Sequence, residues 1–299
     1  MDTLLRAINE PETIRVIAAT TTESVREACR RQGATHVSAI AIGRALTSGA
    51  LLATLAKTER ERVRVQLSGS GPVGQVVIDA HGDGRVRACL RQVLPAKHLA
   101  NRMLDEVPRP STSVAVGLRG TLTVTRDLGL ATPYQGSVEL DNGEIDDDLQ
   151  HYLITSEQLP SALRTAIVLD SEGQVLRAAG VLAQSFPGSD PADIDAVRTR
   201  LVDLRAELVG HARTPAELIG LALDGHPARH MAERNVEFHC PCGPQRALSV
   251  LATLGPTDLE ALAKEREQTE VTCNFCGLVT PVAAAEIEAL AKHLRETQN

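Results

Sequence analysis

The stretch RVRVQLSGSGPVGQVVIDAHGDGRVRACL, residues 62–90, decides the fold of the N-terminal part of the chain. At its start Val63, Val65 and Leu67 alternate with polar side chains, the period of two typical of a strand with one buried face. A glycine-rich turn and a second turn at His81–Gly84 divide the stretch into three segments. We therefore expect antiparallel hairpins here.

The first of these turns, Gly69-Ser-Gly-Pro-Val-Gly74, matches the letters of a dinucleotide-binding motif. That motif needs a following helix whose N-terminus faces the pyrophosphate. Here a β-rich run, residues 75–80, follows instead, so the loop is interpreted as a hairpin turn. No Walker phosphate loop occurs in the sequence, which argues against ATP-driven action.

The surrounding segments combine further strands with a few helices. An apolar core helix is expected over 38–57, because Ile42, Leu46 and Leu55 lie on one helical stripe. Other strand-rich segments are expected at 13–20, 113–125, 137–140, 165–169 and 174–185, and further helices at 22–32 and 145–158. Strands without a regular strand–helix alternation predict an α+β fold, a mainly antiparallel sheet with packed helices, over residues 1–187.

Beyond this first domain the sequence becomes helical and dense in charge. Asp190 can cap a helix whose first position suits Pro191, and Thr214 with Glu217 forms a capping-box pattern for a second helix. An apolar seam recurs at spacings of three and four: Ile194, Val197, Leu201, Leu204 and Leu208. We expect residues 188–232 to be a helical linker that packs on the first domain or is exposed when that packing fails.

Four of the six cysteines lie near the C-terminal end, as Cys240-Pro-Cys242 and Cys273-Asn-Phe-Cys276. Two such pairs can offer one metal ion four sulfurs, and thiolates favour zinc in a closed tetrahedral shell. The sequence therefore predicts a small C-terminal domain, 233–299, that binds one zinc ion (Zn) per chain in the reduced state.

Two roles for such a site remain open from the residues alone. A four-sulfur zinc site is usually a permanent structural staple, but its sulfurs can also be oxidised to disulfides when the metal leaves. The tight Cys-x-Cys spacing favours oxidation of neighbouring sulfurs and weakens the purely structural interpretation. A saturated shell lacks the open position of a catalytic zinc, and the Cys-x-x-Cys pair does not open a helix as in thioredoxin-like enzymes, so we expect no enzyme.

Other candidate residues are expected to have ordinary roles. His239 adjoins Cys240, but four thiolates already fill a tetrahedral shell, so it is interpreted as a bystander. Cys29 and Cys89 are isolated, and we expect both to be small buried hydrophobes. Phe275 is expected to pack the small domain.

Composition excludes several classes of partner. The net charge of −7, an aromatic content of 2% and the absence of Trp argue against nucleic-acid binding. No signal-peptide-like run and no stretch of about 18 uncharged apolar residues occurs, so we expect no membrane partner. Thiols clustered as ligands indicate a reducing compartment, which predicts a cytoplasmic protein.

Several motifs, in order along the chain, carry a resemblance to a known family. They are Leu67-Ser-Gly-Ser-Gly-Pro72, Tyr134-Gln-Gly136, Gly143-Glu-Ile145, Ser156-Glu-Gln-Leu-Pro-Ser161, Ala179-Gly-Val-Leu-Ala-Gln-Ser-Phe-Pro-Gly188 and the two cysteine pairs. Nearly end to end, the sequence resembles the redox-regulated 33 kDa chaperonin family of bacteria.

The resemblance implies an ATP-independent holdase, idle when reduced and zinc-bound, that captures unfolded or partly folded client proteins under oxidative stress. It implies that Cys240, Cys242, Cys273 and Cys276 bind the zinc and that oxidation forms Cys240–Cys242 and Cys273–Cys276 disulfides. It also implies a homodimer on oxidation. The alternative is a constitutive zinc-stapled module that docks one defined partner, and a thiol oxidoreductase is a third, less favoured hypothesis.

Overall fold

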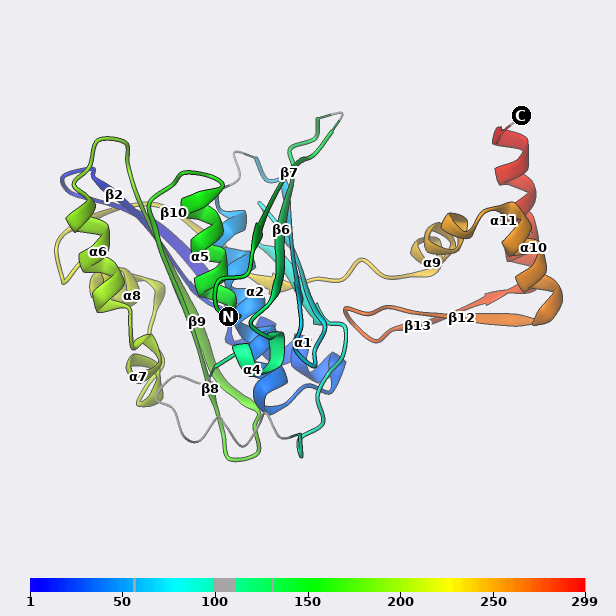
Figure 1. The fold of residues 1–299 in the computed structure, drawn as a ribbon, viewed down its shortest axis with the longest axis horizontal. Helices are drawn as coiled ribbons and strands as arrows, with labels where there is room; N and C mark the ends of the chain where they lie inside the picture. Colours follow the sequence, from blue (N-terminus) through cyan, green and yellow to red (C-terminus); the bar gives the residue numbers. More distant parts are fainter. Residues whose placement is uncertain (56–57, 99–110, 131, 299) are drawn as a thin grey trace. The chain divides into compact units, whose positions relative to one another are not determined.

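The computed structural model describes residues 1–55, 58–98, 111–130 and 132–298 (Figure 1). The chain separates into two units, Met1–His239 and Cys240–Asn299. Mixed sheets and helices confirm the predicted α+β class. The segment expected to be the linker belongs to the first unit.

A five-stranded antiparallel sheet forms one layer of the first unit. In spatial order its strands are β10 (Ala228–Asn235), β1 (Thr3–Asn9), β2 (Ile14–Thr20), β9 (Val175–Ser185) and β8 (Ser161–Leu169). Two of these strands differ from expectation. Strand β1 was not predicted, and β10 lies in a region predicted to be helical and spans the expected 232/233 boundary. Its partner strand lies at the opposite end of the chain, so local periodicity does not reveal it.

The second layer is a six-stranded sheet that contains the predicted hairpins. Its order is β11 (Glu237–Phe238), β5 (Arg85–Leu90), β4 (Gln75–His81), β3 (Arg62–Gly69), β6 (Gly120–Asp127) and β7 (Tyr134–Glu139). The glycine-rich loop is a hairpin turn as predicted, since the Gly69 N–H donates to the Gly74 carbonyl at 3.0 Å. The strand-rich segment expected at 113–125 is partly wrong, because a helical turn, α4 (Ser113–Val116), precedes β6.

Helix α2 (His36–Ala53) lies between the two sheets and contacts strands of both (Figure 1). Every side chain from Val37 to Ala53 is buried. Within the described ranges, α2 alone is long and apolar enough to cross a membrane, and 94% of that window is buried inside the protein. It is therefore a core helix, as the apolar stripe predicts. It ends before the expected Lys57, which lies outside the described residues.

Two other helices complete this layer: α1 (Thr22–Gln32) and α5 (Ile145–Thr155). Both pack against α2, and α5 also contacts β8 of the five-stranded sheet. They close the core between the sheets, which consists mainly of aliphatic side chains.

Three linker helices cover the other face of the five-stranded sheet: α6 (Pro191–Arg200), α7 (Leu204–Val209) and α8 (Pro215–Ala222). The predicted caps are present, because the Asp190 side chain accepts from the Ala192 N–H at 2.9 Å and Thr214 with Glu217 forms a capping box. The apolar seam is fully buried against the sheet. The seam does not lie on one continuous helix, because α6 ends near Leu201 and the Asp203 side chain caps α7.

The second unit is small and has a thin core. It contains α9 (Pro244–Leu251), a 3-10 turn η1 (Ala252–Leu254), α10 (Pro256–Glu265), the hairpin β12 (Gln268–Thr272) and β13 (Val279–Ala283), and α11 (Ala284–Gln298). Its buried apolar side chains are Ala247, Leu251, Leu259, Ala263, Val282, Ile287 and Ala291. Six partly buried hydrophobic side chains pack against these seven, three of which are alanines, so the core is small for a unit of this size.

A buried carboxylate ties three strands of the six-stranded sheet together. Asp79 on β4 is fully buried and contacts Arg62, Arg64 and Arg87 on the neighbouring strands at 2.7–2.8 Å. Burial by itself would raise the pKa of Asp79, but hydrogen bonds from the arginines hold that pKa well below its usual range. Asp79 is thus an ionised anchor for this sheet.

Asp79→Asn is expected to lower the free energy of unfolding by about 3 kcal/mol, because three arginines lose their counter-charge while Arg62 and Arg64 keep some water contact. The folded-state pKa is depressed, so this contribution is present above the ordinary pKa of about 3.9 and is lost as pH falls through the folded value. Urea unfolding at neutral and acid pH measures both effects. Asp83→Asn, which breaks a more exposed pair with Arg85, should change stability by less than about 1 kcal/mol.

Candidate metal centre

The four C-terminal cysteines come from two loops of the second unit. Cys240 and Cys242 precede α9, and Cys273 and Cys276 lie in the turn between β12 and β13. In that turn the Cys273 N–H donates to the Leu278 carbonyl at 3.0 Å, and the Gly277 N–H donates to the Cys273 carbonyl at 2.8 Å. Each loop presents two sulfurs on one side, as the spacing predicts.

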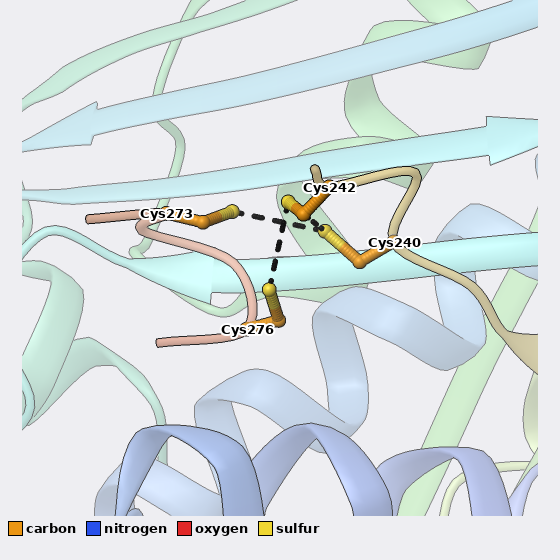
Figure 2. Close-up of side chains that lie close together, drawn as sticks. All are labelled: Cys240, Cys242, Cys273 and Cys276. Atoms are coloured by element: carbon orange, nitrogen blue, oxygen red, sulfur yellow. Dashed lines mark hydrogen bonds between the residues drawn. The ribbon is translucent and has the colours of Figure 1, made fainter. Parts of the chain in front are cut away.

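The four side chains point toward one another (Figure 2). The Sγ atoms all lie within 4.8 Å of one another. Individual separations are 3.2 Å for Cys240–Cys242, 3.7 Å for Cys240–Cys273 and 3.6 Å for Cys242–Cys276. A tetrahedral ion with metal–sulfur bonds of about 2.3 Å needs sulfur separations of about 3.8 Å. The donor set therefore fits one four-sulfur metal ion.

All four are thiols rather than disulfides, and two of them have shifted pKa values. Burial, followed by hydrogen bonds with the other three sulfurs, raises the pKa of Cys242. Burial would also raise the pKa of Cys273, but hydrogen bonds from the Cys242 thiol and from the N–H groups of Cys276 and Phe275 lower it to about 7. The β12–β13 turn thus stabilises a thiolate, the form of cysteine that binds metals.

The other cysteines and His239 lie outside the cluster. His239 contributes a backbone N–H to the Val86 carbonyl at 3.1 Å, and its ring is not among the converging ligand atoms. Cys29 on α1 and Cys89 on β5 are 3% and 4% exposed, as predicted for buried hydrophobes. Burial raises the pKa of Cys29 to about 12, which makes its thiol unreactive. Phe275 is half-buried beside the turn.

His239→Ala is expected to leave the metal content at the wild-type level, because the four sulfurs already complete a tetrahedral set. Metal analysis of purified protein measures this. Cys240→Ala is the matched comparison at the adjacent position and should lose most of the metal. A His239 variant with as little metal as the Cys240 variant would make the histidine a ligand.

Comparison with known proteins places these features in a family. A family model described as Hsp33 protein matches residues 2–279, which include all four converging cysteines. The chain belongs to the Hsp33 family. This confirms the family that the sequence motifs predicted.

Relatives in the Hsp33 family align with nearly the whole chain. The 33 kDa chaperonin of Shouchella clausii is 32% identical over 291 residues, which are 97% of each protein. That of Bacillus subtilis is 33% identical over 292 residues, covering 97% of this chain and 98% of the relative. The crystal structure of the 33 kDa chaperonin (heat shock protein 33 homolog) from Thermotoga maritima matches 99% of both chains, with a TM-score of 0.83 and 25% identity. By name the family is one of chaperones rather than enzymes.

Proposed function

We propose that this protein is a redox-regulated, ATP-independent chaperone of the holdase type. One observation carries the proposal: four cysteine thiols converge within 4.8 Å in a small unit of a chain from a chaperone family. Such a site can hold that unit folded only while its thiols are reduced. Its oxidation state can therefore control the rest of the chain.

Zinc is the ion that best suits this site. Thiolates select soft or borderline metals, and a closed four-sulfur shell is the usual structural zinc arrangement. Cys240, Cys242, Cys273 and Cys276 would hold one zinc ion per reduced chain. The bound ion would supply the folding free energy that the thin core of the second unit lacks, about 10 kcal/mol or more for structural zinc.

Oxidation would then open the site. Each disulfide forms when two thiolates lose two electrons, which one hydrogen peroxide accepts together with two protons from solvent to give two waters. As the resemblance to the family implies, the sulfurs would pair as Cys240–Cys242 and Cys273–Cys276, each within one loop. Four ligands are lost in two such steps, and the second unit unfolds.

The apolar surface under the linker helices would receive clients. Helices α6, α7 and α8 cover a face of the five-stranded sheet whose buried hydrophobic side chains are all aliphatic. When the second unit unfolds, the chain directly before Cys240 loses its folded attachment on one side. Exposed aliphatic surface on the sheet and linker would bind unfolded or partly folded proteins, or a second copy of the chain as a homodimer. Reversible thiol chemistry of this kind suits the cytoplasm.

The test compares reduced, zinc-loaded protein with protein treated with peroxide at elevated temperature. A chromogenic chelator measures zinc release, peptide mapping identifies the disulfides, and binding of reduced, carboxymethylated α-lactalbumin reports client capture. We expect about one zinc released per chain, the two local disulfides, and binding only after oxidation. Retained zinc and equal binding in both states would favour the alternative, a constitutive zinc-stapled interaction module.

A further inference from the structure

One short segment closes an edge of both sheets of the first unit. Strand β10 pairs antiparallel with β1 at the edge of the five-stranded sheet. Two residues later, β11 pairs parallel with β5 at the edge of the six-stranded sheet. We call residues 228–239 the edge segment. It ends directly before Cys240, the first sulfur of the metal centre.

Strand β10 is attached mainly through its backbone. Its sequence, ARHMAERN, is rich in residues that disfavour strands, and five of its eight side chains are exposed. The ladder to β1 is also interrupted by an irregularity between Arg6 and Ala7. An ion pair from Arg229 to Glu12 is exposed at both ends and contributes little. Such a strand can leave the sheet at low cost.

The end of the edge segment is anchored next to the cysteines. The Val236 N–H donates to the Asp2 carbonyl at 3.0 Å, and the Glu237 N–H donates to the Gly84 carbonyl at 3.1 Å. The Phe238 ring lies 5.3 Å from the Arg31 guanidinium carbon. These contacts fix the point where the chain enters the metal-binding unit. Unfolding of that unit would leave the edge segment held only by these contacts and by its pairing with β1 and β5.

We propose that β10 is a removable edge strand and that the β1 edge it covers binds an extended segment of a client protein by strand addition. The inference rests on the proposed chaperone function and names a docking surface for it. Strand β1 offers Leu4 on the core side of the sheet and Leu5 on the linker side. A client strand beside it would gain main-chain hydrogen bonds and aliphatic contacts on both faces.

The strand that already pairs with β1 indicates which kind of ligand this edge can bind. Strand β10 shows that β1 accepts an extended polypeptide over its full length, from Thr3 to Asn9. Main-chain hydrogen bonds do not depend on side-chain identity, so this recognition suits unfolded chains of varied sequence. Most backbone groups of a folded partner are already hydrogen-bonded internally, so an unfolded chain offers far more unpaired backbone to this edge.

The test bridges β10 to β1 covalently. Arg6 and Ala232 are register partners across the two strands, so Arg6→Cys with Ala232→Cys can be bridged by dibromobimane while zinc protects the site thiols. The matched control is Ile8→Cys with Arg15→Cys, which bridges β1 to β2 and leaves β10 free. Both bridged proteins are then treated with peroxide, and zinc release and binding of carboxymethylated α-lactalbumin are measured.

We expect the β10-bridged protein to release zinc but to bind less client than the control, because the linker surface stays available while the β1 edge does not. The control should bind as oxidised wild type does. Equal binding by both bridged proteins would overturn the removable strand while leaving the chaperone function intact. If oxidised wild type itself fails to bind, the proposed function fails and this inference fails with it.

A second variant acts without added cysteines. Gly84 has φ +96°, and a Cβ there would lie 2.0 Å from the Asn235 carbonyl oxygen. Gly84→Ala should therefore push the edge segment away, whereas Gly129→Ala, at φ +72° with open space around it, shares only the backbone strain. We expect faster hydrogen exchange over 228–238 and client binding without oxidant for Gly84→Ala alone. Unchanged exchange, or faster exchange without binding, would contradict the proposal.

Discussion

Cys276→Ser should unfold the Cys240–Asn299 unit and leave the core between the two sheets of the first unit folded. Cys276 is the most buried of the four converging cysteines, and its loss leaves three sulfurs for an ion that needs four. Structural zinc contributes about 10–16 kcal/mol, as much as the whole net stability of a typical domain, so a unit with this thin core should not stay folded without it. Limited proteolysis and amide NMR, with zinc analysis of the same sample, measure the effect for each unit.

The matched control for Cys276→Ser is Cys89→Ser. Cys89 is also buried, but it lies on β5 in the other unit and outside the sulfur cluster. This variant should keep its zinc and a folded second unit, whatever small cost it imposes on the sheet. A Cys276→Ser protein whose second unit still resists protease would show that the unit does not depend on the metal, and the switch would lose its physical basis.

Leu204→Ala should loosen the linker and allow client binding without oxidation. Leu204 begins α7, is 1% exposed and packs on the aliphatic face of the five-stranded sheet. Truncation of a buried leucine costs about 2–5 kcal/mol, most of which falls on the contact between linker and sheet. Hydrogen exchange over 191–222 and binding of carboxymethylated α-lactalbumin by the reduced, zinc-loaded protein measure the two consequences.

Val202→Ala provides the comparison for Leu204→Ala. Val202 lies two residues away in the same turn but is 60% exposed, so its truncation removes little buried surface. It should leave both exchange and binding at the wild-type level. If Leu204→Ala accelerates exchange as expected but reduced protein still ignores the unfolded client, the surface beneath the linker is not where clients bind.

The sequence predicted those parts of the fold that depend on local pattern. The hairpins of residues 62–90 follow from a period of two and from glycine turns, and α2 follows from an apolar stripe. The cysteine cluster follows from spacing, because two closely spaced pairs on separate loops can converge on one ion. In each case the signal is a spacing or a period that can be read along the chain without knowledge of distant contacts.

The parts that were missed depend on distant partners. Strand β10 has a polar sequence without alternation, and it is a strand because the edge of β1 supplies its hydrogen bonds. The break between α6 and α7 depends on Asp203, whose side chain caps α7. The apolar seam continues across this break, so the hydrophobic pattern alone does not reveal it. The low pKa of Cys273 arises from N–H groups gathered by the turn, and no spacing pattern reveals it.

The central claim is that oxidation of the four-sulfur site switches on client capture. The most direct measurement records zinc release and light scattering from heat-denatured citrate synthase in the same sample during peroxide treatment at elevated temperature. The account predicts that scattering falls in step with zinc release and rises again when a dithiol reductant and zinc restore the site. Complete zinc release with scattering unchanged from the reduced protein would contradict it.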